Sequence, residues 1–343
     1  MEKKSLYQYI KENIVNGQLP EKFSLSSDMP KNKIRFADGA ADGIAIYHMG
    51  GAEVSKESID LLQELMHDIS DGRYDIAREK LKKFAEQNTP INAIDDFEKF
   101  IFDHTSWIDS NKLYDFAIEC MMSSNIDIVK YGLEMAEVFS NPSEEMKEIV
   151  RTLGLCEEFT IFSIFHMQGW DNSNQELFAL AQKVHGWGRI HIIKRLEPET
   201  EEIKKWLLKE GIVNTILFDY SALEVYNKAE VRTLLKMELT EEEINSIAVI
   251  ISSLISEEPV AGISSIEDGN QMLLDFLNQV KHFEPSLTLC ETVLSIQLAE
   301  RSKEIDSICK EILYADKVKK AVIDWVKEGK ALKLAKNLNK ERM

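Results

Sequence analysis

No apolar run in this 343-residue sequence approaches the roughly 20 residues that a membrane-spanning helix needs. The longest such stretch is "IAVIISSLI" at 247–255. The first residues, "MEKKSLYQYIKENIV", have a basic start but neither a continuous apolar core nor a small-residue cleavage site, so they do not resemble a secretory signal. We therefore expect a cytoplasmic protein with no membrane partner.

Paired cysteines are also lacking. The four cysteines are scattered and none forms a C-x-x-C motif, which argues against a disulfide framework and against a four-thiolate zinc site. We expect them to be small buried side chains in a reducing compartment; they are Cys120, Cys156, Cys290 and Cys309.

Positive charge is scarce. The formal net charge is -18, whereas binding to nucleic acid requires a positive face, so we expect no nucleic-acid partner. The same argument disfavours the DNA glycosylases that are built from HEAT-like repeats. The end of the chain differs, because residues 317–343 contain nine Lys or Arg against three Asp or Glu.

Recognisable catalytic and cofactor motifs are missing as well. The sequence contains no P-loop, no G-x-G-x-x-G and no G-x-S-x-G. A carboxylate-bridged di-iron site needs two Glu-x-x-His pairs, and only Glu64 and His67 form one. These two residues lie off the apolar face of their segment, so we interpret them as solvated. Whether the protein is an enzyme stays open at this point, and no metal or cofactor is indicated.

What the sequence does contain is apolar residues at helical spacing along most of its length, with 44% hydrophobic residues to build a core. Prolines fall between the periodic segments, and Ser or Asn often begins the next one, as in "SNPSEEMKE". The pattern predicts an all-α protein of short helices joined by short connections.

A degenerate internal repeat refines this prediction. The pattern acidic-x-[Val/Ala]-[Lys/Arg]-x-x-Leu occurs at 75–81 and at 127–133, and weaker relatives include Arg189 and Arg232. The intervals are longer and less regular than the roughly 40–47 residues of HEAT or armadillo repeats. We predict a HEAT-like helical-hairpin solenoid, in which stacked helix pairs form one core and a concave face. The alternative is an irregular helical bundle.

Three regions follow from these patterns. Residues 1–54 are expected to form an N-terminal helix and a Gly/Asp-rich loop that caps the array, with an irregular or β-hairpin conformation favoured by the short alternations "KIRF" and "IAIYHM". Residues 55–316 are expected to form the repeat array. Residues 317–343 are expected to form a basic C-terminal helix that binds an acidic partner, docks on the protein's own acidic body, or is simply solvated.

The loop "RFADGAADGIAIYHMGG" at 35–51 is the first candidate site. Asp38, Asp42 and His48 offer oxygen and imidazole ligands, so a divalent metal is conceivable, although the loop lacks the bidentate Glu of an EF-hand. Asp-Gly is also a common turn dipeptide, in which glycine supplies the positive φ. A structural turn is the favoured interpretation.

The second candidate site is "HGWGRIHIIKRL" at 185–196. Glycine amides at a helix start beside an arginine are typical of an anion site, with Trp187 as one wall. The same residues also fit a tight turn that fills a core gap with an aromatic ring and an arginine bonded internally. The residues of this candidate are His185, Trp187, Arg189 and His191.

The stretches "IRFADGAADGIAIYHMGG" and "HGWGRIHIIKRLEPETEEIKKWLLKEG" resemble the most distinctive segments of a bacterial family labelled limonene hydroxylase. The resemblance implies an NAD(P)H-dependent monooxygenase that oxidises a monoterpene. Such chemistry needs a flavin, a haem or a metal to activate oxygen. The residues themselves contain no motif for any of these groups.

Two functions therefore stand side by side. The leading one is a non-catalytic helical-repeat protein that binds a partner protein or a small ligand on its concave face. The alternative is limonene hydroxylation, with the Gly-rich stretches as its site.

Overall fold

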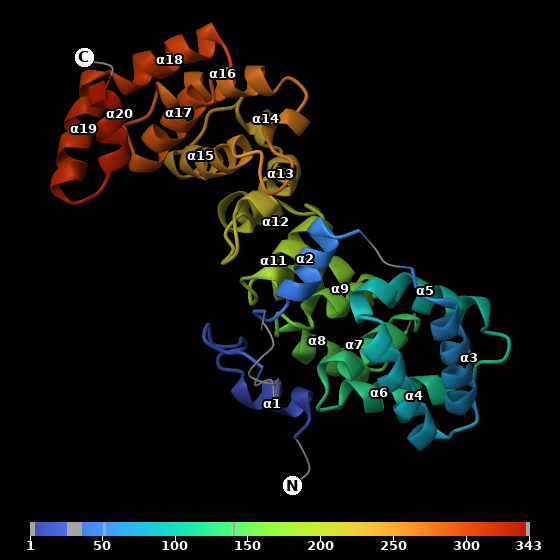
Figure 1. Ribbon diagram of the computed structural model, residues 1–343. Helices are drawn as coiled ribbons and strands as arrows, with labels where there is room; N and C mark the ends of the chain where they lie inside the picture. The colour runs from blue at the N-terminus through green and yellow to red at the C-terminus, as the bar shows by residue number, and fades with distance from the viewer. Residues whose placement is uncertain (1–3, 26–35, 51–52, 140, 341–343) are drawn as a thin grey trace. The chain divides into compact units, whose positions relative to one another are not determined.

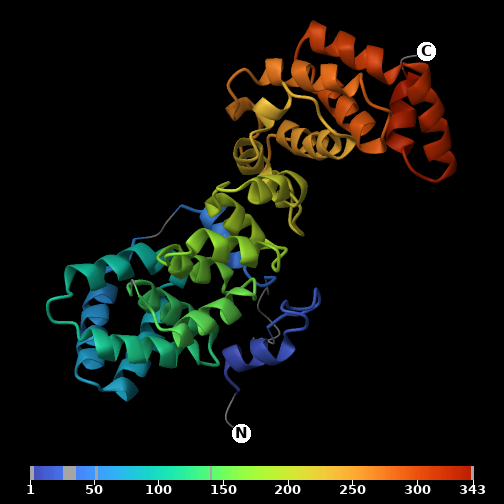
Figure 2. The ribbon, with the colours of Figure 1, turned by 180° about the vertical axis from the view of Figure 1, so that it is seen from behind.

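The computed structural model describes residues 4–25, 36–50, 53–139 and 141–340, without the side chains of residues 339 and 340 (Figures 1 and 2). These residues form twenty α-helices and no strand; their one β-type pairing joins Val15 and Gln18. The prediction of an all-α helical fold is confirmed. Within the described ranges, no helix combines the length and the apolarity that crossing a bilayer requires.

The chain divides into two compact units, Met1–Leu196 and Glu197–Met343. The boundary lies inside the repeat array expected at 55–316, and it follows the end of a helix at Leu196, just before Pro198. Unit 1 contains α1 Leu6–Asn13, α2 Ala40–His48, α3 Lys56–Ser70, α4 Tyr74–Gln87, α5 Pro90–Asp103, α6 Ser110–Met121, α7 Ile126–Glu137, α8 Glu144–Gly154, α9 Thr160–Gln168, α10 Ser173–Ala181 and α11 Trp187–Arg195.

Unit 2 has the same all-helical character. It contains α12 Glu201–Trp206, a π-helical turn at Leu207–Gly211, α13 Asp219–Lys228, α14 Val231–Leu234, α15 Glu241–Ile255, a 3₁₀ turn at Ile263–Ser265, α16 Gly269–Val280, α17 Leu287–Leu298, α18 Lys303–Leu313, α19 Asp316–Lys327 and α20 Leu332–Lys340.

Each unit is built from packed helix pairs. In unit 1, α3 packs on α4, α6 on α7, α8 on α9, and α10 on α11; in unit 2, α17 packs on both α15 and α18. The core of unit 1 centres on Tyr131, whose ring contacts Phe84 and Phe97 and whose hydroxyl donates to the Asn88 carbonyl at 2.9 Å. Burying these aromatic faces requires both helices of a pair and their neighbours, so the pairs stack rather than stand alone.

The N-terminal region is partly helical. The alternation "IAIYHM" lies in helix α2 rather than in a strand, and of "KIRF" only Phe36 belongs to the described residues. Gly39 adopts a left-handed conformation, with φ 75°, directly before α2, whereas the Asp42-Gly43 dipeptide lies inside the helix and makes no turn. The three alanines of α2 favour a helix once this start is held in place.

Helix α2 lies beside α11, far from it in sequence (Figures 1 and 2). The contact is close at Gly43, where a Cβ atom would lie 2.3 Å from ring atoms of Trp187. One turn later, Tyr47 lies against both Trp187 and His191, with ring centroids 6.0 Å apart in each pair. The two glycine-rich stretches of the sequence therefore meet in the fold.

We expect Gly43→Ala to loosen α2 from α11. Alanine stabilises an isolated helix by about 1 kcal/mol relative to glycine, so a loss has to come from the overlap of the added methyl group with Trp187, which we place at about 1–3 kcal/mol. Hydrogen exchange of the amides of residues 40–48, followed by mass spectrometry, measures this directly. Gly50→Ala is the control, because nothing lies within 4 Å of the Cβ it would add. Unchanged protection of α2 in Gly43→Ala would show that the contact is looser than described.

Candidate functional site

The amides at the start of α11 are occupied by the protein itself. Glu157, in the connection between α8 and α9, accepts hydrogen bonds from the backbone N–H groups of His185 at 2.9 Å and Gly186 at 2.7 Å, and from that of Gly188. A carboxylate at a helix N-terminus also interacts favourably with the helix dipole. The position that the sequence suggested for an anion thus holds an internal carboxylate.

The other residues of that candidate also make internal contacts. Arg189 is buried and its Nε donates to the carbonyls of Ala181 at 3.1 Å and Val184 at 2.8 Å. His191 is buried against Tyr47, neither ring nitrogen has a hydrogen-bond partner among the described residues, and burial lowers its pKa to about 3. His191 is therefore a neutral imidazole near pH 7.

The three residues of the first candidate site have different surroundings in the fold. Asp38 accepts from the backbone N–H of Leu25 at 2.9 Å, Asp42 pairs with Lys130, and His48 is exposed at the end of α2. Across the described ranges, no group of three or more His, Cys, Asp or Glu side chains is arranged to hold a metal ion. Two of the seven candidate residues of the sequence, Trp187 and His191, have rings in contact, and α2 lies beside them.

The most unusual feature of unit 1 is a row of charged residues on one face of α7, which we call the α7 stripe. It consists of Asp127, Lys130, Glu134 and Glu137. Spacings of three and four residues place these side chains along a single face of the helix. Because α7 is buried on nearly every side, Lys130 and Glu134 lie in the protein interior, whereas Glu137 is half-buried and Asp127 is exposed.

Lys130 anchors the α7 stripe. It is only 3% exposed, and its Nζ lies 2.6 Å from an oxygen of Asp42 and 2.6 Å from an oxygen of Glu158. Burial alone would lower the pKa of Lys130, but the two facing carboxylates outweigh it and raise the pKa above its usual value. Glu158 also accepts from the backbone N–H of Gly39 at 2.8 Å, so one carboxylate links α7 to the start of α2.

At the C-terminal end of the α7 stripe, the carboxyl groups outnumber the cations near them. Glu134 is 1% exposed and neither of its oxygens has a hydrogen-bond partner among the described residues. Burial, followed by the proximity of Glu98 and Glu137, raises the pKa of Glu134 well above its usual value. Burial and a hydrogen bond with Glu98 raise the pKa of Glu137 to about 9, while Arg195 opposes the shift. With its pKa at about 9, Glu137 is protonated in the folded protein at neutral pH, and the pKa of Glu134 is shifted in the same direction.

Sequence reasoning missed these residues because each was considered within its own helix. Lys130 was noticed only as a repeat position, and Glu134, Glu137, Glu157 and Glu158 were not noticed. Little in the sequence could have revealed their burial, because charged residues along one face of a helix, as in "IDIVKYGLEMAE", are typical of a solvent-exposed face.

The four thiols are not candidates for chemistry. All four cysteines are buried, as expected. Burial is the main cause of a raised pKa in each thiol, which reaches about 12 for Cys290 and Cys309. A thiol that does not ionise near neutral pH is a poor nucleophile.

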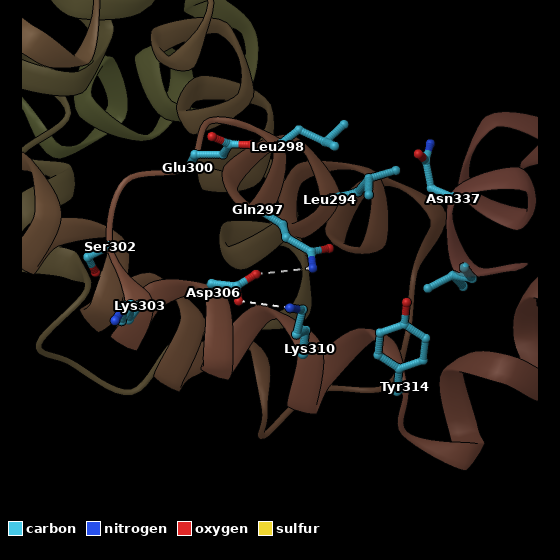
Figure 3. Close-up of a pocket in the computed structure, with 11 residues that line it drawn as sticks. Leu294, Gln297, Leu298, Glu300, Ser302, Lys303, Asp306, Lys310, Tyr314 and Asn337 are labelled. Atoms are coloured by element: carbon cyan, nitrogen blue, oxygen red, sulfur yellow. Dashed lines mark hydrogen bonds and ion pairs between the residues drawn. The ribbon is translucent and has the colours of Figure 1, made fainter. Parts of the chain in front are cut away.

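Unit 2 contains a pocket with a volume of about 670 Å³ between the end of α17, helix α18 and helix α20 (Figure 3). We call it the α17–α20 pocket. At its centre, Asp306 accepts from Gln297 at 3.3 Å and pairs with Lys310 at 2.9 Å, while Tyr314 and Asn337 lie across from them. The lining residues are Leu294, Gln297, Leu298, Glu300, Ser302, Lys303, Asp306, Lys310, Tyr314, Asn337 and Leu338.

Comparison with family models identifies one similarity. Residues 228–343 match Pox_H7, late protein H7. The match covers most of unit 2, including the α17–α20 pocket, and leaves out unit 1 with its α7 stripe. No curated protein and no solved structure matches the chain.

This similarity corrects the interpretation drawn from the glycine-rich stretches. The resemblance to limonene hydroxylases is wrong, because the family model that residues 228–343 match is that of late protein H7, a poxvirus family. In the fold, Gly39 and Gly43 of the first stretch lie against Trp187 of the second. Limonene hydroxylation is not favoured as a function.

We expect Lys130→Met to destabilise unit 1 by about 3–5 kcal/mol, because it leaves Asp42 and Glu158 facing each other without a cation. Urea unfolding of the full chain, followed by circular dichroism, measures the loss. Adding Asp42→Asn to the variant should restore part of it. The control is Lys82→Met, which removes only an exposed pair with Glu79 and should change stability by less than about 0.5 kcal/mol. Equal stability of Lys130→Met and the natural protein would refute an anchoring role.

We also expect Glu134 and Glu137 to contribute less to the stability of unit 1 as the pH rises. The pKa of Glu134 and of Glu137 is higher in the folded state than the usual 4.5, so the folded state holds protons that the unfolded state releases. The stabilisation is complete below pH 4.5 and is lost as the pH rises, toward about 9 for Glu137. Lys130 and Arg195 are the cations that limit the loss.

Glu134→Gln tests this dependence, because glutamine keeps the shape of the side chain and cannot ionise. Above pH 6.5, the ordinary pKa of the buried His191, urea midpoints at constant ionic strength should fall less steeply for this variant than for the natural protein. Glu145→Gln, at an exposed position of α8, should reproduce the natural curve. Parallel curves for all three proteins would show that Glu134 does not hold its proton.

Proposed function

We propose that the protein is a non-catalytic binding protein that recognises a polar segment of a partner protein in the α17–α20 pocket of unit 2. The observation that carries this proposal is the pocket itself. Its volume of about 670 Å³ lies in the range of roughly 300–1,000 Å³ that is typical of ligand sites.

The chemistry of the lining supports binding rather than catalysis. The lining offers amide, hydroxyl, ammonium and carboxylate groups, which donate and accept hydrogen bonds, but neither histidine nor cysteine. Its central carboxylate, Asp306, has a lowered pKa because of its hydrogen bond with Lys310. A general acid or base works best with a pKa near the operating pH, and a lowered carboxylate pKa moves away from it.

The charges of the lining favour a polar partner without a strong charge of its own. Lys303 and Lys310 are balanced by Glu300 and Asp306. Three leucines on the walls provide apolar contact between the polar groups; they are Leu294, Leu298 and Leu338. An extended peptide with alternating polar and apolar side chains matches such a mixture.

The similarity to late protein H7 supports a binding site in unit 2. The matching residues include all the helices that form the pocket, and nothing in the description of that family names a reaction. The proposal keeps the interpretation of a helical partner-binding protein that the sequence favoured.

A peptide-display selection on the purified full-length protein tests the proposal. Leu298 lines the pocket and is 54% exposed, so Leu298→Trp should fill the pocket without disturbing the core. Peptides selected on the natural protein should bind this variant at least about tenfold more weakly. Ile76→Trp adds the same bulk at an exposed position of α4 and should leave binding unchanged. The proposal fails if selection yields no enriched peptide, or if enriched peptides bind the Leu298→Trp variant as tightly as the natural protein.

A further inference from the structure

A second hollow in unit 2 lies between α19 and α20 and has a volume of about 460 Å³. We call it the α19–α20 groove. Its surface is mainly apolar, formed by Val322, Ile323 and Val326 of α19 with Ala335 and Leu338 of α20. Ile323 is 58% exposed, which makes it one of the most exposed large apolar side chains among the described residues. An apolar row of this kind is typical of a surface that receives another helix.

Lysines stand at both ends of the groove. Lys319 and Lys327 lie one helical turn before and after Ile323 and line the groove with it. Each pairs with an aspartate three residues away on the same exposed helix face, at 3.1 Å and 2.9 Å. Exposed pairs of this kind contribute little stability, so both lysines are available to exchange partners.

The charged residues that line the groove are both cationic. They are Lys319 and Lys327, and no Asp or Glu is among the described residues that line it. The groove thus combines an apolar floor with a cationic rim, in a protein whose overall charge is -18. This rim favours a negatively charged occupant and disfavours a basic one.

We propose that the α19–α20 groove binds an acidic amphipathic helix of a partner protein. The apolar side of that helix would cover Ile323 and its neighbours, and its carboxylates would face the lysines of the rim. The inference is independent of the proposed function of the α17–α20 pocket. The two hollows share Tyr314 and Leu338, so neither residue is used to separate them experimentally.

Fluorescence anisotropy with the full-length protein tests the inference. The probes are labelled helical peptides of about four turns, with leucines along one face in several spacings and glutamates elsewhere. The matched peptides carry lysine in place of every glutamate. We expect the acidic peptides to bind, the basic ones to bind at least about tenfold more weakly, and added salt to weaken the acidic complex.

Two variants locate the binding surface. Ile323→Asp, and separately the double variant Lys319→Glu with Lys327→Glu, should each weaken acidic-peptide binding at least about tenfold. All these positions are exposed or at the helix surface, so the variants should fold, and circular dichroism would check this. The controls are Ile76→Asp, and Lys82→Glu with Lys99→Glu, which make the same changes on exposed helices of unit 1.

The remaining outcomes overturn the inference. Equal binding of acidic and basic peptides, or no effect of Ile323→Asp, shows that the groove does not select this partner. Binding to phosphatidylserine vesicles without binding to any acidic peptide assigns the lysines to a lipid surface. Self-association that Ile323→Asp abolishes assigns the groove to a second copy of the chain. Leu298→Trp should leave acidic-peptide binding intact, which separates failure of this inference from failure of the α17–α20 pocket.

Discussion

The buried ion group around Lys130 is the interaction on which the arrangement of unit 1 depends. One ammonium group is enclosed by carboxylates from α2 and from the connection before α9, so three separate parts of the chain meet at one charge. Each of these charges alone would be costly in the interior, and together they stabilise one another only in this geometry. A short helix such as α2, at the end of a loop, gains a defined position from this constraint.

The same short connection positions two helices. Glu157 accepts from the amides at the start of α11, and its neighbour Glu158 accepts from the amide of Gly39 at the start of α2. The two helices then pack on each other where Gly43 meets Trp187. Electrostatics thus determines where both helices begin, and the missing side chain of a glycine determines how closely they approach.

Much of the helical fold could be predicted from the sequence because helix starts and apolar spacing are local signals. Ser143 caps α8 and Pro90 begins α5, as the punctuation of the sequence indicated. Helix α2 was not predicted, because its glycines resemble turn residues and the partners that stabilise it lie 88 or more residues away in the chain. The candidate site was only partly predictable for the same reason. The sequence singled out Trp187 and His191, which meet in the fold, but none of the residues that line the α17–α20 pocket. Lys130 and Glu134 acquire their character only through burial between helices.

The adjacency of Glu157 and Glu158 has a consequence for how this protein can vary. Connections between helices usually tolerate inserted and deleted residues, because they lie on the surface and contact little else. Here two consecutive carboxylates hold different helices, so the spacing between them and the ends of α8 and α9 is constrained. A single inserted residue would carry one carboxylate away from its helix. The stretch between Gly154 and Thr160 is therefore a place where the chain can change its side chains more readily than its length.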